Sequence, residues 1–153
     1  MPKLDLDAIP QSNDTGYPAP FHQEVQGRWW RRLAPVLGLT QMGASHVVLK
    51  PGAWSSQRHW HIGEDELVVM LSGEAVLVGK NWPVLRAGDV AGWAAGVQNG
   101  HKIEIRSDAD CVFVAISAGD RSTGGAYSDI DMTFGHEGYF HRGGKRYPTK
   151  RLP

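Results

Sequence analysis

The chain has 153 residues, of which 41% are hydrophobic and 21% are charged. This length suits one domain with one core, and the composition is that of a soluble globular protein rather than a disordered or fibrous one. The 16 Lys and Arg residues balance the 16 Asp and Glu residues, so no net charge draws the chain to nucleic acid or to a membrane surface. We expect neither as a partner.

The single cysteine and the lack of long apolar segments predict a cytoplasmic protein. Cys111 has no second cysteine to pair with, which fits a reducing compartment. No basic residue adjoins it to activate the thiol, so we expect Cys111 to pack as a small apolar residue. No window approaches the roughly 18 apolar residues of a membrane span, and the first residues lack the apolar stretch of a secretory signal.

Residues 1–27 are predicted to form an irregular N-terminal arm. They are polar, and the first 20 residues hold Pro2, Pro10, Pro18 and Pro20.

An aromatic and basic cluster follows at residues 28–32, Arg-Trp-Trp-Arg-Arg. Such a cluster could stack on nucleic-acid bases, but in isolation it is a weak signal for that function. We favour a structural interpretation, in which one tryptophan packs inward. Its neighbour and the arginines then cover a sheet edge or a subunit interface.

From residue 43, short apolar segments alternate with turns rich in Gly, Pro, Asn and Asp. The predicted strands are 44–50, 56–61, 66–71, 74–78, 83–86, 90–93, 101–106 and 111–117. Short strands at this spacing are typical of an all-β sandwich or barrel. We assign this β domain to residues 28–118 and expect no helix longer than two turns.

The strand pattern fades in the last part of the chain. We expect residues 119–153 to be loop and tail, packed on or near the β domain, with one short extended piece near 130–134. The Gly143-Gly144 pair and Pro148 argue against a helix there. Residues 142–151 contain five basic residues and no acid, which we interpret as a solvated basic tail.

Two histidines and a nearby carboxylate form the strongest chemical signal. His59 and His61 are separated by one residue, so on a strand both side chains point to the same face. Glu66 begins the next predicted strand, and its carboxylate can reach the same space. Imidazole and carboxylate together are typical ligands of a divalent transition metal.

Three consecutive acids compete for the carboxylate role. Glu66 is favoured because it is in phase with Val68 and Met70 along the strand. We expect the preceding Glu64 and Asp65 to be solvated.

Two blocks of sequence resemble the motifs of the cupin superfamily. The first contains Gly52, then His59-Trp60-His61, Glu66 and Gly73; the second runs from Gly88 through Gly96 to His101. The gap from Gly52 to His59 is one residue longer than usual, Ala94-Ala95-Gly96 stands where Pro-x-Gly is common, and Ile105 stands where Asn is frequent. The similarity covers about residues 44–117. More loosely, residues 139–144 resemble the tail of a group of small bacterial cupins without a settled activity.

This resemblance implies a double-stranded β-helix (jelly-roll) barrel with a metal in its mouth, and often a homodimer. The implied ligands are His59, His61, Glu66 and His101. Three neutral imidazoles and one carboxylate would leave a divalent ion with a net charge of about +1 and open positions for an anionic oxygen ligand. Mn, Fe, Ni, Zn and Cu all fit this ligand set.

The same period of two predicts the walls of the pocket. The residues in phase with the ligands are Gln57, Val68, Met70, Ile103 and Ile105. This lining is mostly apolar with one amide, and we expect no Lys or Arg to face inward. A highly charged or phosphorylated sugar would be poorly served by it.

We therefore predict a mononuclear-metal enzyme acting on a small anionic or oxygen-rich organic compound. Dioxygenase, decarboxylase and isomerase types all remain open, since no clear general base is visible beside the metal site. The alternative is a non-catalytic binding or sensor protein. Four histidines lack spacing partners, namely His22, His46, His136 and His141; His141 is a candidate for folding over the barrel mouth.

Overall fold

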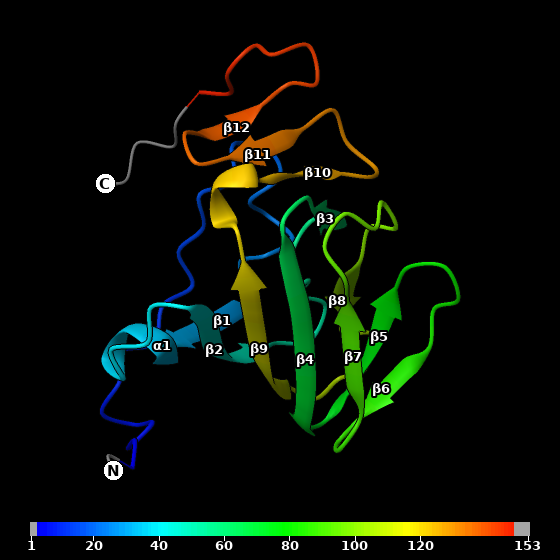
Figure 1. Cartoon of the computed structure of the whole chain (residues 1–153). Helices are drawn as coiled ribbons and strands as arrows, with labels where there is room; N and C mark the ends of the chain where they lie inside the picture. Colours follow the sequence, from blue (N-terminus) through cyan, green and yellow to red (C-terminus); the bar gives the residue numbers. More distant parts are fainter. Residues whose placement is uncertain (1–2, 149–153) are drawn as a thin grey trace.

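The computed structural model describes residues 3–148, so Lys150 and Arg151 of the basic tail lie outside the described residues. The protein is built almost entirely of short antiparallel strands (Figure 1). In chain order the elements are β1 (Arg28–Arg32), α1 (Leu33–Val36), β2 (Met42–Leu49), β3 (His59–His61), β4 (Glu64–Ser72), β5 (Glu74–Val78), β6 (Val84–Arg86), β7 (Val90–Trp93), β8 (Lys102–Glu104), β9 (Cys111–Gly119), η1 (Arg121–Thr123), β10 (Gly125–Tyr127), β11 (Thr133–Gly135) and β12 (Gly138–Phe140).

The barrel is formed by a five-stranded sheet in the order β1-β2-β9-β4-β7 and a three-stranded sheet in the order β6-β5-β8. The long strands β4 and β9 lie at the centre of the view, with β5 and β6 at one side (Figure 1). The predicted all-β, double-stranded β-helix fold is confirmed. Among the described residues, no helix is long and apolar enough to cross a membrane.

The main core lies where inward side chains of the two barrel sheets meet. Leu49, Met70 and Cys111 are fully buried there, and Ile103 and Phe113 pack among them. The apolar side chains at alternate positions of each strand form this core because successive residues point to opposite faces. Cys111 packs as a small apolar residue, as the sequence predicts.

Strand β1 was not predicted, although it pairs with β2 along its whole length. The register runs from Arg28 opposite Leu49 to Arg32 opposite Ser45. Its five residues contain no Val or Ile, and the aromatic and basic composition hides the alternation. The strand forms because β2 offers an unpaired edge for its backbone groups.

The last part of the chain forms a third sheet in the order β12-β11-β10-β3. β10, β11 and β12 lie above the barrel in Figure 1; β11 overlaps the short extended piece expected near 130–134, whereas the prediction of loop and tail was wrong for β10 and β12. Each has three residues and contains a glycine, too short to produce an alternating pattern. They are stabilised by pairing: Gly125 lies opposite His61 and Tyr127 lies opposite His59.

The N-terminal arm packs against this third sheet. A second core cluster joins Tyr17 and Val25 of the arm to Tyr127 and Met132. The division into an arm, a barrel domain and an extension at residues 27/28 and 118/119 stays a prediction.

Candidate metal centre

His59 and His61 are carried by β3, which is held on both sides. One neighbour is β10, and the other is the segment at His101. The backbone N–H of His59 donates to the carbonyl of His101 at 3.1 Å, and that of His101 donates to the carbonyl of His59 at 2.8 Å. Two residues 42 positions apart in the chain are thereby fixed side by side.

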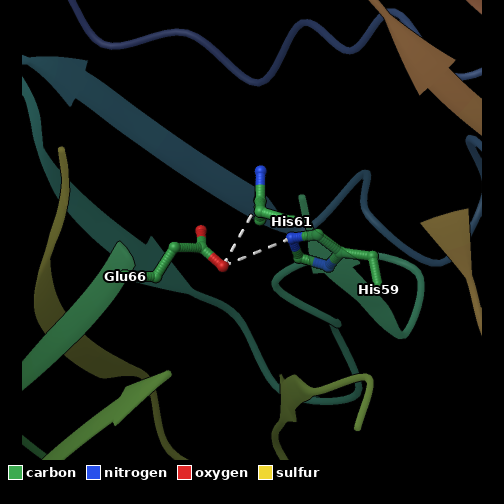
Figure 2. A group of neighbouring side chains, drawn as sticks. All are labelled: His59, His61 and Glu66. Atoms are coloured by element: carbon green, nitrogen blue, oxygen red, sulfur yellow. Dashed lines mark ion pairs between the residues drawn. The ribbon is translucent and has the colours of Figure 1, made fainter. Parts of the chain in front are cut away.

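The three imidazoles converge on one carboxylate oxygen. The Nε2 atoms of His59, His61 and His101 lie 3.7, 3.3 and 2.8 Å from Oε2 of Glu66. Figure 2 shows Glu66 pointing from β4 toward His59 and His61 on β3. Ligand atoms of His59, His61 and Glu66 can be chosen that all lie within 4.8 Å of one another.

These atoms are not satisfied by hydrogen bonds among themselves. Oε2 of Glu66 and Nε2 of His61 are buried and have no hydrogen-bond partner of good geometry among residues 3–148. Buried polar atoms without partners are costly and call for an explanation. The ligand atoms of His59, His61 and Glu66 nevertheless lie within 4.8 Å of one another. A divalent metal ion fits this arrangement, because nitrogen and carboxylate oxygen are its ordinary ligands.

Contacts at the far side of each ring orient the imidazoles. Nδ1 of His59 lies 3.0 Å from the carbonyl of Gln57. A carbonyl can only accept, so Nδ1 carries the proton and Nε2 is left free toward Glu66. The ring of His101 stacks on Trp93 with a centroid separation of 3.7 Å and an interplanar angle of 9°.

A second carboxylate holds His61. Nδ1 of His61 lies 3.1 Å from Oε2 of Glu64, and Oε1 of Glu64 lies 3.2 Å from Nε of Arg121. The expectation that Glu64 is solvated was wrong: its side chain is only 11% exposed. Glu64 is in phase with Glu66 along β4, so it faces the same side. Asp65 is exposed, and its Oδ1 accepts a hydrogen bond from the backbone of Ala95.

The electrostatics of the cluster favour one neutral and one charged imidazole. Burial lowers the pKa of His59 to about 4, so this ring is neutral at neutral pH. Burial also opposes the charged form of His61, but the contacts with Glu64 and Glu66 outweigh it and raise its pKa to about 9. Burial would raise the pKa of Glu66, yet His101 and His61 hold it well below its usual range. The protonated imidazole of His61 thus places a positive charge between the carboxylates of Glu64 and Glu66. A metal cation bound to this cluster would supply positive charge at the same place.

The cluster opens into a cavity of about 380 Å³. Val68 lines this cavity, as predicted from its phase with Glu66. Met70, Ile103 and Ile105 do not line it, because they lie deeper in the main core.

Gln57 also lies away from the cavity, contrary to expectation. Its amide nitrogen lies 3.1 Å from the carbonyl of Phe21 and 3.2 Å from Oε2 of Glu24. The prediction extended the strand of His59 back through Gln57, but β3 begins only at His59. The alternation therefore does not reach Gln57.

Two arginines line the cavity that was expected to hold none. Arg28, Trp30 and Arg32 are alternate residues of β1 and all face it. The expectation of no inward Lys or Arg was wrong. The reason given for excluding a phosphorylated ligand therefore no longer holds. The spacing of two between Arg28, Trp30 and Arg32 was a visible signal, but only the pairing with β2 shows which face of β1 points inward.

Comparisons with known proteins agree with this architecture. The family model described as "Cupin domain" matches residues 45–117. A sugar phosphate isomerase of the cupin superfamily from Silicibacter pomeroyi has a similar crystal structure: 34% identity, a TM-score of 0.90, and coverage of 99% of this chain and 100% of that one. The chain belongs to the cupin superfamily.

Two further solved structures are less similar to this cupin. A proposed sugar phosphate isomerase from Acidithiobacillus ferrooxidans is 25% identical, with a TM-score of 0.66 and coverage of 76% of this chain and 72% of that one. A predicted oxalate decarboxylase from Thermotoga maritima, at 24% identity, shares the fold with a TM-score of 0.53 over 61% of this chain and 81% of that one. The comparison with curated proteins finds no match.

The remaining histidines of this cupin lie outside the cavity lining. His141 does not cover the barrel mouth: its Nδ1 lies 2.9 Å from Oδ2 of Asp131, and its ring stacks on Tyr147. His46 alternates with Ser45 and Val47, which line the cavity, so it faces the other side of β2.

Proposed function

We propose that this cupin binds one divalent transition metal ion through His59, His61, Glu66 and His101 and acts as an enzyme on a small anionic, oxygen-rich organic compound. The observation that carries the proposal is the convergence of three imidazole nitrogens on Oε2 of Glu66 within a cavity. A bound divalent ion supplies Lewis-acid chemistry there. Mn, Fe, Ni, Zn and Cu all fit the donor set.

The residues of the cavity suit a small polar anion. Arg28 and Arg32 supply positive charge, while Val68 and Phe113 form an apolar wall that excludes water from part of the space. The volume of about 380 Å³ lies in the usual range for small-molecule sites. Isomerisation of a phosphorylated sugar is the first reaction to test, because the 34% identical relative is described as a sugar phosphate isomerase. Decarboxylation and dioxygenation are the other reaction classes.

A second candidate is a non-catalytic binding or sensor protein. Among the described residues, Glu66 is the only carboxylate that lines the cavity, and it is a proposed ligand. Burial raises the pKa of Tyr17, another lining residue, to about 12, so this phenol stays protonated. A base independent of the ligands is therefore lacking, which favours binding without turnover.

Metal content is the first experiment. Protein purified without a metal-affinity step should contain close to one divalent ion per chain by inductively coupled plasma mass spectrometry. The double variant His59→Ala/His101→Ala should lose it. His136→Ala, an exposed histidine in the turn between β11 and β12, is the control and should keep it. Unchanged metal content in the double variant would show that the ligand assignment is wrong.

Turnover then separates the two candidates. Metal-loaded protein is assayed with phosphorylated aldoses and ketoses, and with small carboxylates and diketones under air and under nitrogen. Conversion that depends on His59 and His101 supports an enzyme. Saturable ligand binding without conversion in every reconstituted metal form supports the sensor.

The proposed assembly is a homodimer of a cytoplasmic protein. The outer face of the five-stranded sheet exposes Leu67, Leu71 and Val90, which a second copy could cover. Size-exclusion chromatography with light scattering should give twice the chain mass, and Leu67→Glu should shift it to one chain mass. The cytoplasmic location rests on the single free thiol of Cys111.

A further inference from the structure

Arg28 is a cation in the cavity wall that lacks an acidic partner. Its Nη1 donates to the carbonyl of Ser55 at 2.7 Å, while its Nε is buried without a hydrogen-bond partner in the described part of the chain. It forms no ion pair with any of residues 3–148. The ionisable side chains that act on it are the phenols of Tyr17, Tyr139 and Tyr127, not carboxylates, and burial lowers its pKa.

An unpaired, partly buried guanidinium destabilises a protein unless an anion neutralises it. Arginine is seldom placed in such a position without a carboxylate or phosphate group beside it. Arg28 faces the cavity rather than bulk solvent, so the missing anion would have to lie in the cavity. The residue therefore marks a position for a ligand group.

Arg32 lies two residues further along β1 on the same wall. Its guanidinium carbon is 4.8 Å from the ring centroid of Trp30, which lies between the two arginines and also lines the cavity. Arg32 is exposed and forms no ion pair within residues 3–148. It therefore supplies a second unpaired cation nearer to solvent than Arg28.

The sheet register places Arg32 three strands away from the strand that carries Glu66, and Arg28 lies four residues earlier on β1, opposite Leu49. Arg32 lies opposite Ser45, Ser45 opposite Ala115, and Ala115 opposite Val68, next but one to Glu66 on β4. Three strand spacings separate the backbones of β1 and β4, roughly 14 Å along a flat sheet. The side chains of Arg28, Arg32 and Glu66 all line one cavity of about 380 Å³, which is large enough for a small organic molecule.

We propose that Arg28 and Arg32 bind an anionic oxygen group, a phosphate or a carboxylate, at one end of a two-ended ligand whose other end lies at the His59, His61, Glu66 and His101 cluster. The placement of one end of the ligand at the metal cluster rests on the proposed function. The anion site at Arg28 and Arg32 is inferred from the residues of β1 alone. Guanidinium groups present paired N–H donors that match phosphate and carboxylate oxygens. The ligand is thus a small molecule with a metal-binding oxygen group and a separate anion.

The arginine end is tested first on metal-free protein, with inorganic phosphate and with acetate as probes at constant ionic strength. Thermal unfolding and tryptophan fluorescence report binding, since Trp30 lies between the arginines. We expect saturable stabilisation of the wild type by one of the two anions, and which of them binds identifies the group. Arg28→Gln should weaken that binding by about tenfold or more, and Arg32→Gln by less.

Arg31→Gln is the matched control, because Arg31 lies on the opposite face of β1 and its Nε donates to the carbonyl of Ile9. It should bind the anion like the wild type. Arg28→Lys keeps the positive charge but lacks the paired N–H donors of a guanidinium group, so its affinity for the anion should fall several-fold. Wild-type protein that binds neither anion, or equal loss in Arg28→Gln and Arg31→Gln, would overturn the proposal.

Stability distinguishes a binding residue from a structural one. Arg28→Gln removes an unpaired cation but also its hydrogen bond to Ser55; because these effects oppose each other, the anion-free variant should have a melting temperature close to that of the wild type. A large decrease in its melting temperature, or failure to fold, would identify Arg28 as a structural cation and overturn the proposal.

A two-ended probe tests the link between the sites. Metal-loaded wild type should bind phosphoglycolate, which carries both a carboxylate and a phosphate, about tenfold or more tightly than inorganic phosphate. His59→Ala should lose this advantage and keep the binding of the simple anion. If metal-loaded wild type binds phosphoglycolate no more tightly than inorganic phosphate, the proposal of a two-ended ligand is wrong. A His59→Ala protein that retains its metal would instead overturn the proposed ligand set and leave the arginine site standing.

Discussion

Nδ1 of His61 lies 3.1 Å from Oε2 of Glu64, which connects a proposed metal ligand to a carboxylate that does not itself line the cavity. Arg121 contacts the other oxygen of the same carboxylate. Such a chain fixes the direction of the imidazole and makes its free nitrogen a better donor, as in many metalloproteins. We therefore expect Glu64 to position His61, a role that its place beside Glu66 and Asp65 in the sequence did not reveal.

Glu64→Gln should therefore weaken metal binding by about 10- to 100-fold without changing the ligand set. An amide carries no charge and holds the imidazole less strongly. Competition with a fluorescent chelator measures the affinity. Glu74→Gln, which removes a carboxylate paired with Arg86 on the protein surface, is the control and should bind metal normally. Equal affinities of Glu64→Gln and wild type would remove Glu64 from the metal centre.

Gly125→Ala should destabilise the protein by about 1–3 kcal/mol and lower its metal affinity. A Cβ at this position would overlap the carbonyl oxygen of Trp60 and the ring of Phe134, so β10 would have to move away from β3. Chemical denaturation and metal titration measure the two effects.

Gly135→Ala in the neighbouring β11 is the matched control, because a Cβ there meets nothing within 4 Å. It should resemble the wild type in both measurements. A stable Gly125→Ala protein with normal metal affinity would show that the third sheet does not position His59 and His61.

Cys111 should resist alkylation in the folded protein. The side chain is fully buried, and burial raises the pKa of the thiol to about 11, so the reactive thiolate is scarce at about pH 8. Iodoacetamide labelling followed by mass spectrometry should show little modification under native conditions and complete modification in guanidinium chloride. Rapid labelling of the native protein would contradict the buried position.

Gln57→Ala should reduce stability by about 1–3 kcal/mol and leave metal content and anion binding unchanged. The substitution removes the contacts of the amide with the carbonyl of Phe21 and with Glu24, which join the segment before β3 to the N-terminal arm. Thermal unfolding and the phosphate or acetate titration measure the two properties. A loss of anion binding without a loss of stability would show that Gln57 contributes to the cavity wall.

The sequence by itself determined the all-β fold and the shared face of His59, His61 and Glu66. The spacing of His59 and His61 and the phase of Glu66 with Val68 were sufficient to predict their shared face, because side chains alternate strictly along a strand. The packing of Cys111 as an apolar residue was predicted because no adjacent basic residue activates its thiol. These are local properties, so they can be recognised without knowledge of the strand neighbours.

Only the tertiary structure decided which face of each strand meets the cavity and which distant segments support the site. Alternation groups Arg28 with Arg32 but does not say whether they point inward; the pairing of β1 with β2 decides that. Likewise, β10 acquires its role only by pairing with β3. The physical reason is that strand pairing depends on backbone hydrogen bonds between residues far apart in the chain, and these leave little trace in the local pattern of side chains.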